Sequence, residues 1–449
     1  MASRRAFLAA AAALPAFRPD ALRRAFDAST GLSAGAAQGP RLRPDQGLVA
    51  GPVMPGGAGG PDDEDYWGEI QRAFDLDRSM VNLNNGGCSP APTHVLEQMI
   101  RDLKFSNELP VIHMWQTLEP RLESVRRDLA ATFGCDPEEM AITRNASEGL
   151  ETLIFGLDLQ RGDEVVVSTQ NYGRMLTSWD QRVRRDGIVL KQVKFPIPPK
   201  TKDEILDAFK AAVTPRTRVI EFLHITNLSG QIMPVREMVE WARPRGIEVF
   251  VDGAHAFAQF PFTRDGLGCD YYGTSLHKWL LAPIGTGFLY IRKSKQKKIW
   301  PLMAAPATMD ENIRKYEEIG THPAANHNAI AVALAFHHAI GAERKAARLR
   351  YLRDRWARRV VAESGGRCRV LTPLEGEQAC GIGLVHVEGM DPNRLVGWFM
   401  EKHKVVVTPI VIKDEFDGLR VTPNIYTTPR EVDLFADLLL TAARQGISS

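Results

Sequence analysis

The sequence has few cysteines, and they form no pattern. Its 449 residues contain five cysteines, and no two of them stand in a CxxC spacing. Disulfide frameworks and structural zinc sites both need paired or closely spaced cysteines. The small, dispersed set therefore argues against both kinds of stabilisation, and we expect no metal.

An excess of charge and a long apolar run are also missing. The chain has 56 basic and 54 acidic residues, which leaves a net charge of +2. So small a net charge gives no global attraction to nucleic acid or to an anionic membrane. No apolar run reaches the roughly 18 residues that a membrane-spanning helix needs. We expect neither a nucleic-acid partner nor a membrane attachment once any export signal has been removed.

The N-terminus has the layout of an export signal. MASRRAFLAAAAALPAF places paired arginines before a short apolar run, and SRRAFL resembles the twin-arginine signal. We expect a signal over residues 1–37, cut after Ala36 or Ala37, and a periplasmic protein. The alternative is a cytoplasmic protein with a disordered Ala-rich tail. Residues 38–61, rich in Gly and Pro, are expected to be a linker before the folded enzyme.

The remaining chain alternates short apolar runs with helical stretches, which is typical of an α/β fold. Strands are expected at 140–143, 164–169, 217–226, 247–253, 269–275 and 287–292. Their nearly continuous apolar character indicates a mostly parallel sheet that helices cover on both faces. Residues 62–330 would form this large domain. A long helical region, with basic residues at helical spacing opposite Leu and Ala, opens a small α+β domain over 331–449.

Polar residues follow several of these strands, where parallel sheets bind ligands. They are Asn145 and Ser147, which flank Ala146 at a strand-to-helix turn, then Asn227, then Asp252 and His255, and finally Ser275, His277 and Lys278. A carboxylate, a lysine, an amide and a helix N-terminus at one sheet edge suit pyridoxal 5′-phosphate. A lysine can form a Schiff base with its aldehyde, a carboxylate can keep its ring nitrogen protonated, and helix N–H groups can bind its phosphate.

Taken singly, these residues have ordinary structural explanations. Asp252 or Ser147 could cap a helix, His255 and His277 could be satisfied core histidines, and Lys278 could extend to the surface. All of these explanations would have to hold together at the strand ends of one sheet. The cofactor interpretation needs a single cause instead.

Two motifs extend this interpretation to a family. VDGAHAFAQF and CDYYGTSLHKWLLAPIGTGFLY, in this order, resemble the core of the class V pyridoxal-phosphate-dependent aminotransferases. Within that family the chain is most similar to the isopenicillin N epimerase-like branch, with cysteine desulfurases and kynureninases as relatives. The resemblance runs from about residue 78 to 440. It implies fold type I, with a seven-stranded, mostly parallel sheet and a small C-terminal domain.

The resemblance also implies roles for individual residues. Lys278 would attach the cofactor and act as the base, and Asp252 would pair with the ring nitrogen. Arg420 would hold the substrate carboxylate, and Asn85 and Gly86 would belong to a loop that closes over the substrate. Thr321, beside Gly320, would reach the phosphate of the neighbouring subunit, which makes a homodimer with shared sites. The cofactor set is then Ala146, Ser147, Tyr172, Asn227, Asp252, His255, Ser275, His277, Lys278 and Thr321, with Tyr172 stacked on the ring.

The substrate is expected to be an amino acid or a similar amine, and the reaction stays open. Epimerisation and transamination at Cα are favoured, and inversion would need a second acid, for which Tyr172, His113 and Tyr426 are candidates. A β-lyase is an alternative. A cysteine desulfurase is disfavoured because residues 405–420, before the substrate arginine, lack cysteine. Cys88 keeps that alternative open.

Two further alternatives belong to other classes of protein. The first is a metalloenzyme that uses His322, His327, His337 and His338, although HExxH is absent and no carboxylate lies between these histidines. The second is a catalytically silent protein with this fold that only binds. The complete set of Lys278, Asp252 and Arg420 argues against the second.

Overall fold

A seven-stranded sheet forms the centre of the larger part of the protein, and a computed structural model describes it within residues 59–447. The predicted signal (1–37) and all but the last three residues of the predicted linker (38–61) lie outside the described residues. The strand order is β2-β8-β7-β6-β5-β3-β4. The strands are β2 (Met140–Thr143), β3 (Glu164–Ser168), β4 (Val189–Val193), β5 (Thr217–Leu223), β6 (Glu248–Asp252), β7 (Tyr271–Ser275) and β8 (Gly287–Ile291).

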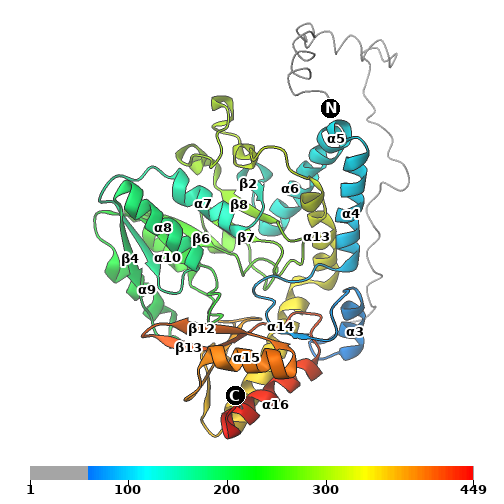
Figure 1. Ribbon diagram of the computed structural model, residues 1–449. Coiled ribbons are helices and arrows are strands. Elements are labelled where there is room, and N and C mark those ends of the chain that lie inside the picture. The colour runs from blue at the N-terminus through cyan, green and yellow to red at the C-terminus, as the bar shows by residue number, and fades with distance from the viewer. Residues whose placement is uncertain (1–58, 448–449) are drawn as a thin grey trace, which may run out of the picture. The chain divides into compact units, whose positions relative to one another are not determined.

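Helices cover both faces of this sheet (Figure 1). On one face α7 (Ala146–Gly156) and α8 (Gly173–Asp186) pack against side chains such as Val167 and Phe250. On the other face lie α6 (Glu119–Phe133), α9 (Lys202–Ala212), α10 (Val235–Ala242) and α13 (Ile330–Ile340). Both faces are therefore buried, as the apolar strand sequences indicate, and the predicted α/β class with a mostly parallel sheet is confirmed.

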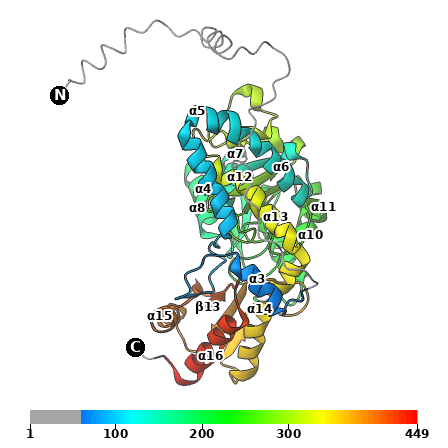
Figure 2. The ribbon, with the colours of Figure 1, turned by 90° about the vertical axis from the view of Figure 1, so that its right-hand side faces the viewer.

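A second, antiparallel sheet forms the smaller part. Its order is β12-β13-β10-β9, and three helices share its apolar core. The strands are β9 (Cys368–Val370), β10 (Gly383–Val387), β12 (Thr408–Ile412) and β13 (Phe416–Val421), and the helices are α14 (Ala342–Glu363), α15 (Pro392–His403) and α16 (Pro429–Gln445). Figure 2 shows α3 (Glu64–Arg72) beside α14, and the two share an apolar cluster. The predicted boundary at residue 330 stays a prediction.

The N-terminal segment of the described chain connects the two sheets. Its β1 (Val81–Asn82) pairs with β11 (Val405–Val406) beside the small sheet. It then runs into α4 (Thr93–Glu108), α5 (Pro110–Ile112) and a π-helical turn before α6. The remaining α-helices of the described residues are the short α11 (Arg264–Leu267) and α12 (Ala325–Asn328). No described helix is long and apolar enough to cross a membrane.

The direction of the strands fixes where the polar residues meet. Strands β3, β4, β5, β6 and β7 are parallel. Because β8 is antiparallel to both β7 and β2, strand β2 runs in the same direction as this group. The carboxyl ends of β2, β5, β6 and β7 therefore share one edge of the sheet, where such sheets bind ligands.

Candidate active site at the carboxyl edge of the large sheet

A pocket of about 540 Å³ lies at this edge. It is lined by Gly87, Arg144, Asn145, Ala146, Ser147, Glu148, Leu150, Glu151, Tyr172, Arg174, Leu223, Ile225, Asn227, Asp252, Ala254, His255, Ser275, His277, Lys278 and Leu302. All predicted cofactor-binding residues except Thr321 belong to this lining. The structure thus brings together side chains at the ends of five separate strands, and the role of each stays a prediction.

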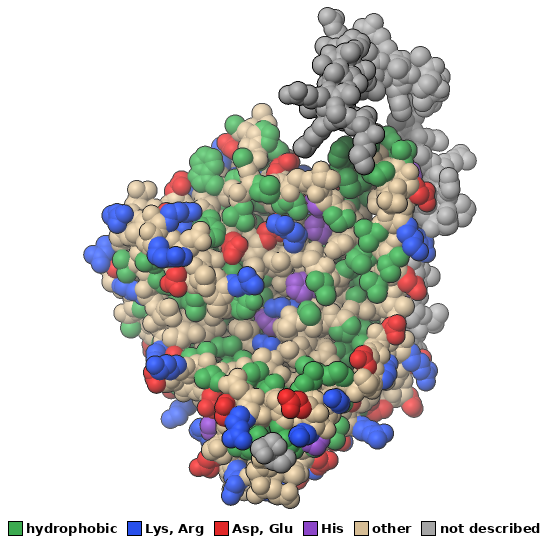
Figure 3. All heavy atoms as spheres, viewed as in Figure 1, with side chains coloured by type: hydrophobic (Ala, Val, Ile, Leu, Met, Phe, Trp, Pro, Cys, Tyr) green, Lys and Arg blue, Asp and Glu red, His purple; other side chains and the backbone are tan. Residues whose placement is uncertain are grey.

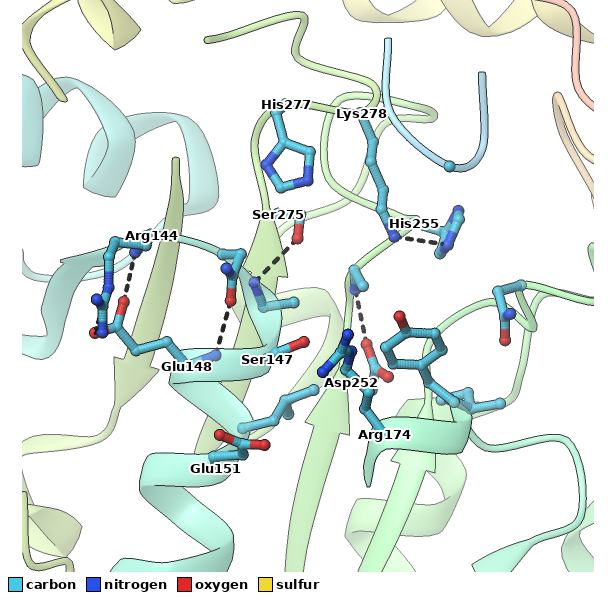
Figure 4. Close-up of a pocket in the computed structure, with 18 of the residues that line it drawn as sticks. Arg144, Ser147, Glu148, Glu151, Arg174, Asp252, His255, Ser275, His277 and Lys278 are labelled. Atoms are coloured by element: carbon cyan, nitrogen blue, oxygen red, sulfur yellow. Dashed lines mark hydrogen bonds and ion pairs between the residues drawn. The ribbon is translucent and has the colours of Figure 1, made fainter. Parts of the chain in front are cut away.

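Lys278 enters the pocket from the loop that follows β7. Its Nζ donates a hydrogen bond to Nε2 of His255, at 2.8 Å (Figure 4). Burial, which is the largest cause, lowers the pKa of Lys278 to about 8; Asp252 and Cys88 oppose this effect, and Arg420 adds to it. A lowered pKa leaves roughly a tenth of the amine unprotonated at pH 7. Lys278 can therefore act both as a nucleophile and as a base.

Asp252 ends β6 deep in the pocket and is 4% exposed. Its Oδ1 accepts a hydrogen bond from the Ala254 amide, at 2.9 Å. Burial raises the pKa of Asp252, whereas this hydrogen bond and the Lys278 amine lower it. The next residue has to be glycine, because a Cβ on Gly253 would lie 1.9 Å from Cζ of Tyr272. The DGAH motif therefore has a steric cause as well as a chemical one.

The start of α7 forms the opposite end of the pocket. Asn145 caps the helix by accepting from the Glu148 amide, at 2.9 Å. Ser275 Oγ accepts from the Ala146 amide, at 3.0 Å, which connects β7 to the helix start. Figure 4 shows Ser147, Ser275 and His277 on this side of the pocket. Free N–H groups and hydroxyls at a helix N-terminus are suited to a phosphate.

Two buried polar atoms at the pocket have no hydrogen-bond partner among the described residues. They are Nδ1 of His255 and Oδ1 of Asn227. Burial lowers the pKa of His255 well below its usual value, so the ring is neutral and carries its proton on Nδ1 when Nε2 accepts from Lys278. Buried donors and acceptors are rarely left unpaired. A ligand with an oxygen atom within hydrogen-bond reach of His255 would satisfy that donor, which fits the phenolic oxygen of pyridoxal phosphate.

Arg420 reaches the site from the centre of the small sheet. Its guanidinium donates to the carbonyl oxygen of Asn227, at 3.0 Å, and to Oδ1 of Asn84, at 2.9 Å. It is 7% exposed, and no described carboxylate forms an ion pair with it. Burial lowers the pKa of Arg420 to about 10, so the side chain stays charged near neutral pH. A buried cation without a protein anion is ready to bind an anionic group of a ligand.

The predicted substrate loop lies next to Arg420. A Cβ on Gly86 would lie 3.6 Å from Cζ of Arg420, while Gly87 rather than Gly86 lines the pocket. Asn85 is fully buried and accepts from the hydroxyl of Tyr426. Its amide nitrogen donates to the carbonyl oxygen of Thr422, at 2.9 Å. Asn85 therefore holds the loop in place through buried hydrogen bonds and does not itself line the pocket.

Thr321 lies elsewhere. With Gly320 it lines a separate pocket of about 460 Å³, together with Arg126 and Arg314. This position is consistent with the expectation that Thr321 serves a neighbouring subunit, and that expectation stays a prediction.

Of the three candidates for a second acid, only Tyr172 lines the pocket. His113 stacks on Phe105, with ring centroids 3.9 Å apart, and its Nδ1 donates to the Phe105 carbonyl. Tyr426 is 5% exposed, and its hydroxyl is held by Asn82 and Asn85. The histidines of the metalloenzyme alternative form no metal-binding group within the described residues.

Sequence reasoning did not identify several residues of this site. Arg174, at the start of α8, lines the pocket two residues after Tyr172. Arg144 also lines it and forms an ion pair with Glu148, at 2.8 Å. A third residue, Glu221, does not line the pocket but lies close enough to Asp252 for that charge to raise its pKa. An acidic residue inside the apolar run TRVIEFLHIT is unusual, and this could have indicated Glu221 from the sequence.

Most of the sequence matches known enzymes. The family model for Aminotransferase class-V matches residues 81–409. This chain belongs to the class V aminotransferase family. An isopenicillin N epimerase of Streptomyces clavuligerus is 31% identical over 392 residues, covering 83% of this chain and 97% of that enzyme. A putative L-cysteine desulfhydrase of Oryza sativa subsp. japonica is 30% identical but covers only 48% of this chain.

Solved structures have the same fold. A cysteine desulfurase from Thermococcus onnurineus, in its apo form, superposes with a TM-score of 0.72 at 20% identity and covers 84% of this chain. The cystine C–S lyase C-DES, in complex with cysteine persulfide, gives a TM-score of 0.70 at 21% identity. These matches confirm the predicted fold. The family confirms an enzyme that uses pyridoxal phosphate.

Proposed function

We propose that this class V enzyme removes the Cα proton of an amino acid, and that it either returns a proton to the opposite face of Cα, which inverts it, or passes the proton to the cofactor and exchanges the amino group. The observation that carries the proposal is that Lys278 and Asp252 line one pocket, while Arg420, which does not line it, donates to the carbonyl oxygen of the pocket residue Asn227 and has no described carboxylate as a partner. Inversion is the first choice because the two epimerases among the relatives match over 97% and 98% of their own length.

When bound, pyridoxal phosphate acts as an electron sink that weakens the Cα–H bond of an attached amine. Asp252 would hold its ring nitrogen, His255 and Asn227 its phenolic oxygen, and the start of α7 with Ser147 and Ser275 its phosphate. Arg420 would fix the substrate carboxylate in a bidentate contact and so set the orientation of Cα. Lys278, with its lowered pKa, would take the proton from Cα.

Inversion needs a proton donor on the face of Cα opposite Lys278. Tyr172 is suited to this role because it lines the pocket and follows a different strand from the one that precedes Lys278. Transamination does not need that second donor, because Lys278 alone can carry the proton. Replacing Tyr172 with phenylalanine should therefore slow inversion much more than it slows transamination.

The experiment that tests the proposed function uses heavy water. Purified full-length enzyme is incubated with a panel of L-amino acids without a keto-acid acceptor, and products are analysed by chiral mass spectrometry. Deuterium at Cα together with the D-isomer would support inversion, and a keto acid with an aminated cofactor would support transamination. No exchange with any amino acid or peptide-like amine would refute the proposal.

A β-lyase or cysteine desulfurase is the second candidate, and one observation favours it. Cys88 is exposed, follows the pocket residue Gly87, and lies close enough to Lys278 to affect its pKa. Release of alanine from L-cysteine in the presence of an added thiol that discharges the sulfur from Cys88, lost in Cys88→Ser but kept in Cys135→Ser, would favour a desulfurase. Release of sulfide, pyruvate and ammonia by both variants would favour a β-lyase. Equal activity of the two variants would exclude Cys88 from the chemistry.

We also propose that two copies assemble with shared sites. Large apolar side chains of α4 and the segment after it are exposed, including Ile100, Val111 and Trp115. Ile284, Trp300 and Leu302 are exposed as well, and Leu302 lines the pocket. Figure 3 shows hydrophobic side chains over α4 and beside the basic and histidine side chains at the centre of this face. Exposed apolar patches of this kind mark interaction sites.

Export through a twin-arginine signal is part of the same proposal. The sequence motif SRRAFL supports it. Replacing Arg4 and Arg5 together with lysine should shift the protein from the periplasmic to the cytoplasmic fraction. An unchanged distribution would exclude export by this route.

A further inference from the structure

A second buried carboxylate lies behind Asp252. Glu221, on β5, is fully buried. In the sheet, Asp252 of β6 stands opposite Leu223 of β5. Glu221 lies two residues before Leu223, so its side chain leaves the same face of the sheet as the Asp252 side chain. The two carboxylates are therefore neighbours on the face that α7 and α8 cover.

Hydrogen bonding at Glu221 favours its ionised form. One carboxylate oxygen accepts from Nδ2 of Asn171, at 3.0 Å, and the other accepts from Nε1 of Trp179. Both oxygens thus receive a donor, which stabilises a carboxylate rather than a carboxylic acid. Burial and the charge of Asp252 act in the opposite direction and raise the pKa of Glu221 to about 7.

No described cation forms an ion pair with Glu221 or with Asp252, which separates these two acids from buried acids such as Glu148, which is paired with Arg144. Glu164, with a side chain only 1% exposed, is paired with Lys191 and Arg216. An ionised carboxylate that is buried without a cation lowers the stability of the folded protein, and two such carboxylates side by side lower it further because they repel each other. A positive charge on the pocket side of Asp252 would relieve both. Asp252 is the titratable group that faces Glu221, while Asn171 and Trp179 are its polar contacts from the loop before α8 and from α8.

We propose that Glu221 is a positioning residue that acts through Asp252 to keep the ring nitrogen of the cofactor protonated. The inference rests on the proposed function of the pocket. Glu221 does not line the pocket, so it adds a negative charge behind Asp252 without touching the cofactor. The pair of carboxylates then binds a pyridinium more tightly than an uncharged ring.

A purely structural role for Glu221 would have a different consequence. Asn171 is also held by Ser168, whose amide and hydroxyl donate to its Oδ1 at 2.9 and 2.7 Å. The loop that carries Tyr172 therefore keeps an anchor when Glu221 loses its charge. Glu221→Gln has nearly the same shape and keeps an acceptor for one of the two donors. It removes the charge and one of the two hydrogen bonds that Glu221 accepts.

The test compares two ligands on full-length protein that has been freed of cofactor. One is pyridoxal phosphate, and the other is its analogue with C–H in place of the ring nitrogen. Glu221→Gln should weaken the binding of pyridoxal phosphate by about tenfold, the order expected for a unit charge acting through protein interior. Glu221→Gln should change the affinity for the analogue by less than about twofold, because the ring of the analogue cannot be protonated. The control Glu248→Gln removes a carboxylate from the far end of β6 and should change neither affinity.

Two further variants test whether Glu221 acts through Asp252 and through its charge. In an Asp252→Asn background the effect of Glu221→Gln should fall below about twofold, because Glu221 acts through Asp252. If Glu221→Gln does not fold, Trp179→Phe removes one donor to Glu221 and so raises the pKa of Glu221 further. The affinity of this variant for pyridoxal phosphate should fall below that of the wild type near about pH 8, where the wild-type carboxylate is ionised, and approach it near about pH 10.

The failures can be told apart. An equal loss for both ligands, no loss for either, or a pH-independent effect of Trp179→Phe would overturn the role of Glu221. A wild-type protein that does not bind pyridoxal phosphate at Lys278 would instead overturn the proposed function.

Discussion

Replacing Arg420 with lysine gives the sharpest test of how the substrate is held. The lysine keeps a positive charge on β13 but loses the planar pair of donors. In the structure Arg420 already donates to Asn227 and Asn84, and no described carboxylate pairs with it. Nη2 also donates to Oγ1 of Thr408, at 3.4 Å, whereas Nε has no hydrogen-bond partner among the described residues. Nε and the second N–H of Nη1 are therefore the donors left for a substrate carboxylate.

The magnitude follows from these contacts. A hydrogen bond to a charged group contributes about 1.5–3 kcal/mol. Losing the bidentate geometry while keeping the charge should cost about 2–3 kcal/mol of transition-state binding, or about 30- to 150-fold in kcat/KM. The assay compares an amino acid with its methyl ester, which has no carboxylate. Arg420→Lys should lower kcat/KM for the acid by this factor and change the ester by less than about threefold.

A matched control comes from the same small sheet. Arg369, on β9, is exposed, and Arg369→Lys should leave both substrates unaffected. If Arg420→Lys impairs the acid and the ester equally, Arg420 supports the loop rather than the substrate. If it impairs neither, the carboxylate is bound elsewhere.

Three other predictions concern the unloaded protein and its assembly. The pKa of Lys278 falls from 10.5 to about 8, so between these pH values the unfolded chain binds more protons than the folded protein, and the stability rises with pH. In denaturant titrations, the difference in unfolding free energy between the cofactor-free wild type and Lys278→Met should therefore change by about 3 kcal/mol from pH 8 to pH 10.5. A difference that stays constant with pH would contradict the pKa shift. Gly253→Ala should lower the melting temperature and the cofactor content, because its Cβ would lie 1.9 Å from Cζ of Tyr272; an unchanged melt would contradict the steric argument. If the sites are shared between subunits, Lys278→Ala and Thr321→Ala enzymes that are refolded together in equal amounts should recover about a quarter of the wild-type activity. About half of the dimers would then contain one subunit of each kind, and one of the two sites in such a dimer would be intact. No recovery would argue against shared sites.

The sequence was most informative where burial is complete. The strands β3, β5, β6, β7 and β8 have mainly apolar sequences and form the inner part of the sheet. Strand β2 lies at one edge, but all its residues are buried, so its sequence MAIT is also readable. Strand β4 was missed because VLKQV lies at the sheet edge, where Val189 is 40% exposed and no apolar pattern is required. The chemistry at the strand ends was readable for the same reason, since Asp252 and Lys278 stand beside clear strands.

Contacts between distant segments could not be predicted. Lys345 lies in a helix whose basic residues appeared to face away from Leu and Ala, yet it is 1% exposed and donates to the carbonyl oxygen of Trp279. The contacts of Arg420 with Asn227 and Asn84 join three separate segments. Spacing along the chain does not constrain such pairs. Only the family resemblance indicated Arg420, and nothing in the sequence indicated its partners.

The two charged groups that we propose to handle a substrate belong to different hydrophobic cores. Lys278 follows β7, which packs within the large sheet, whereas Arg420 lies between Leu419 and Val421, which pack against α14, α15 and α16. A mutation that repacks one core leaves the other group in place. Selection can therefore remodel substrate preference through the C-terminal part while cofactor attachment is inherited unchanged. Exchange of that part between relatives is expected to transfer specificity as a module.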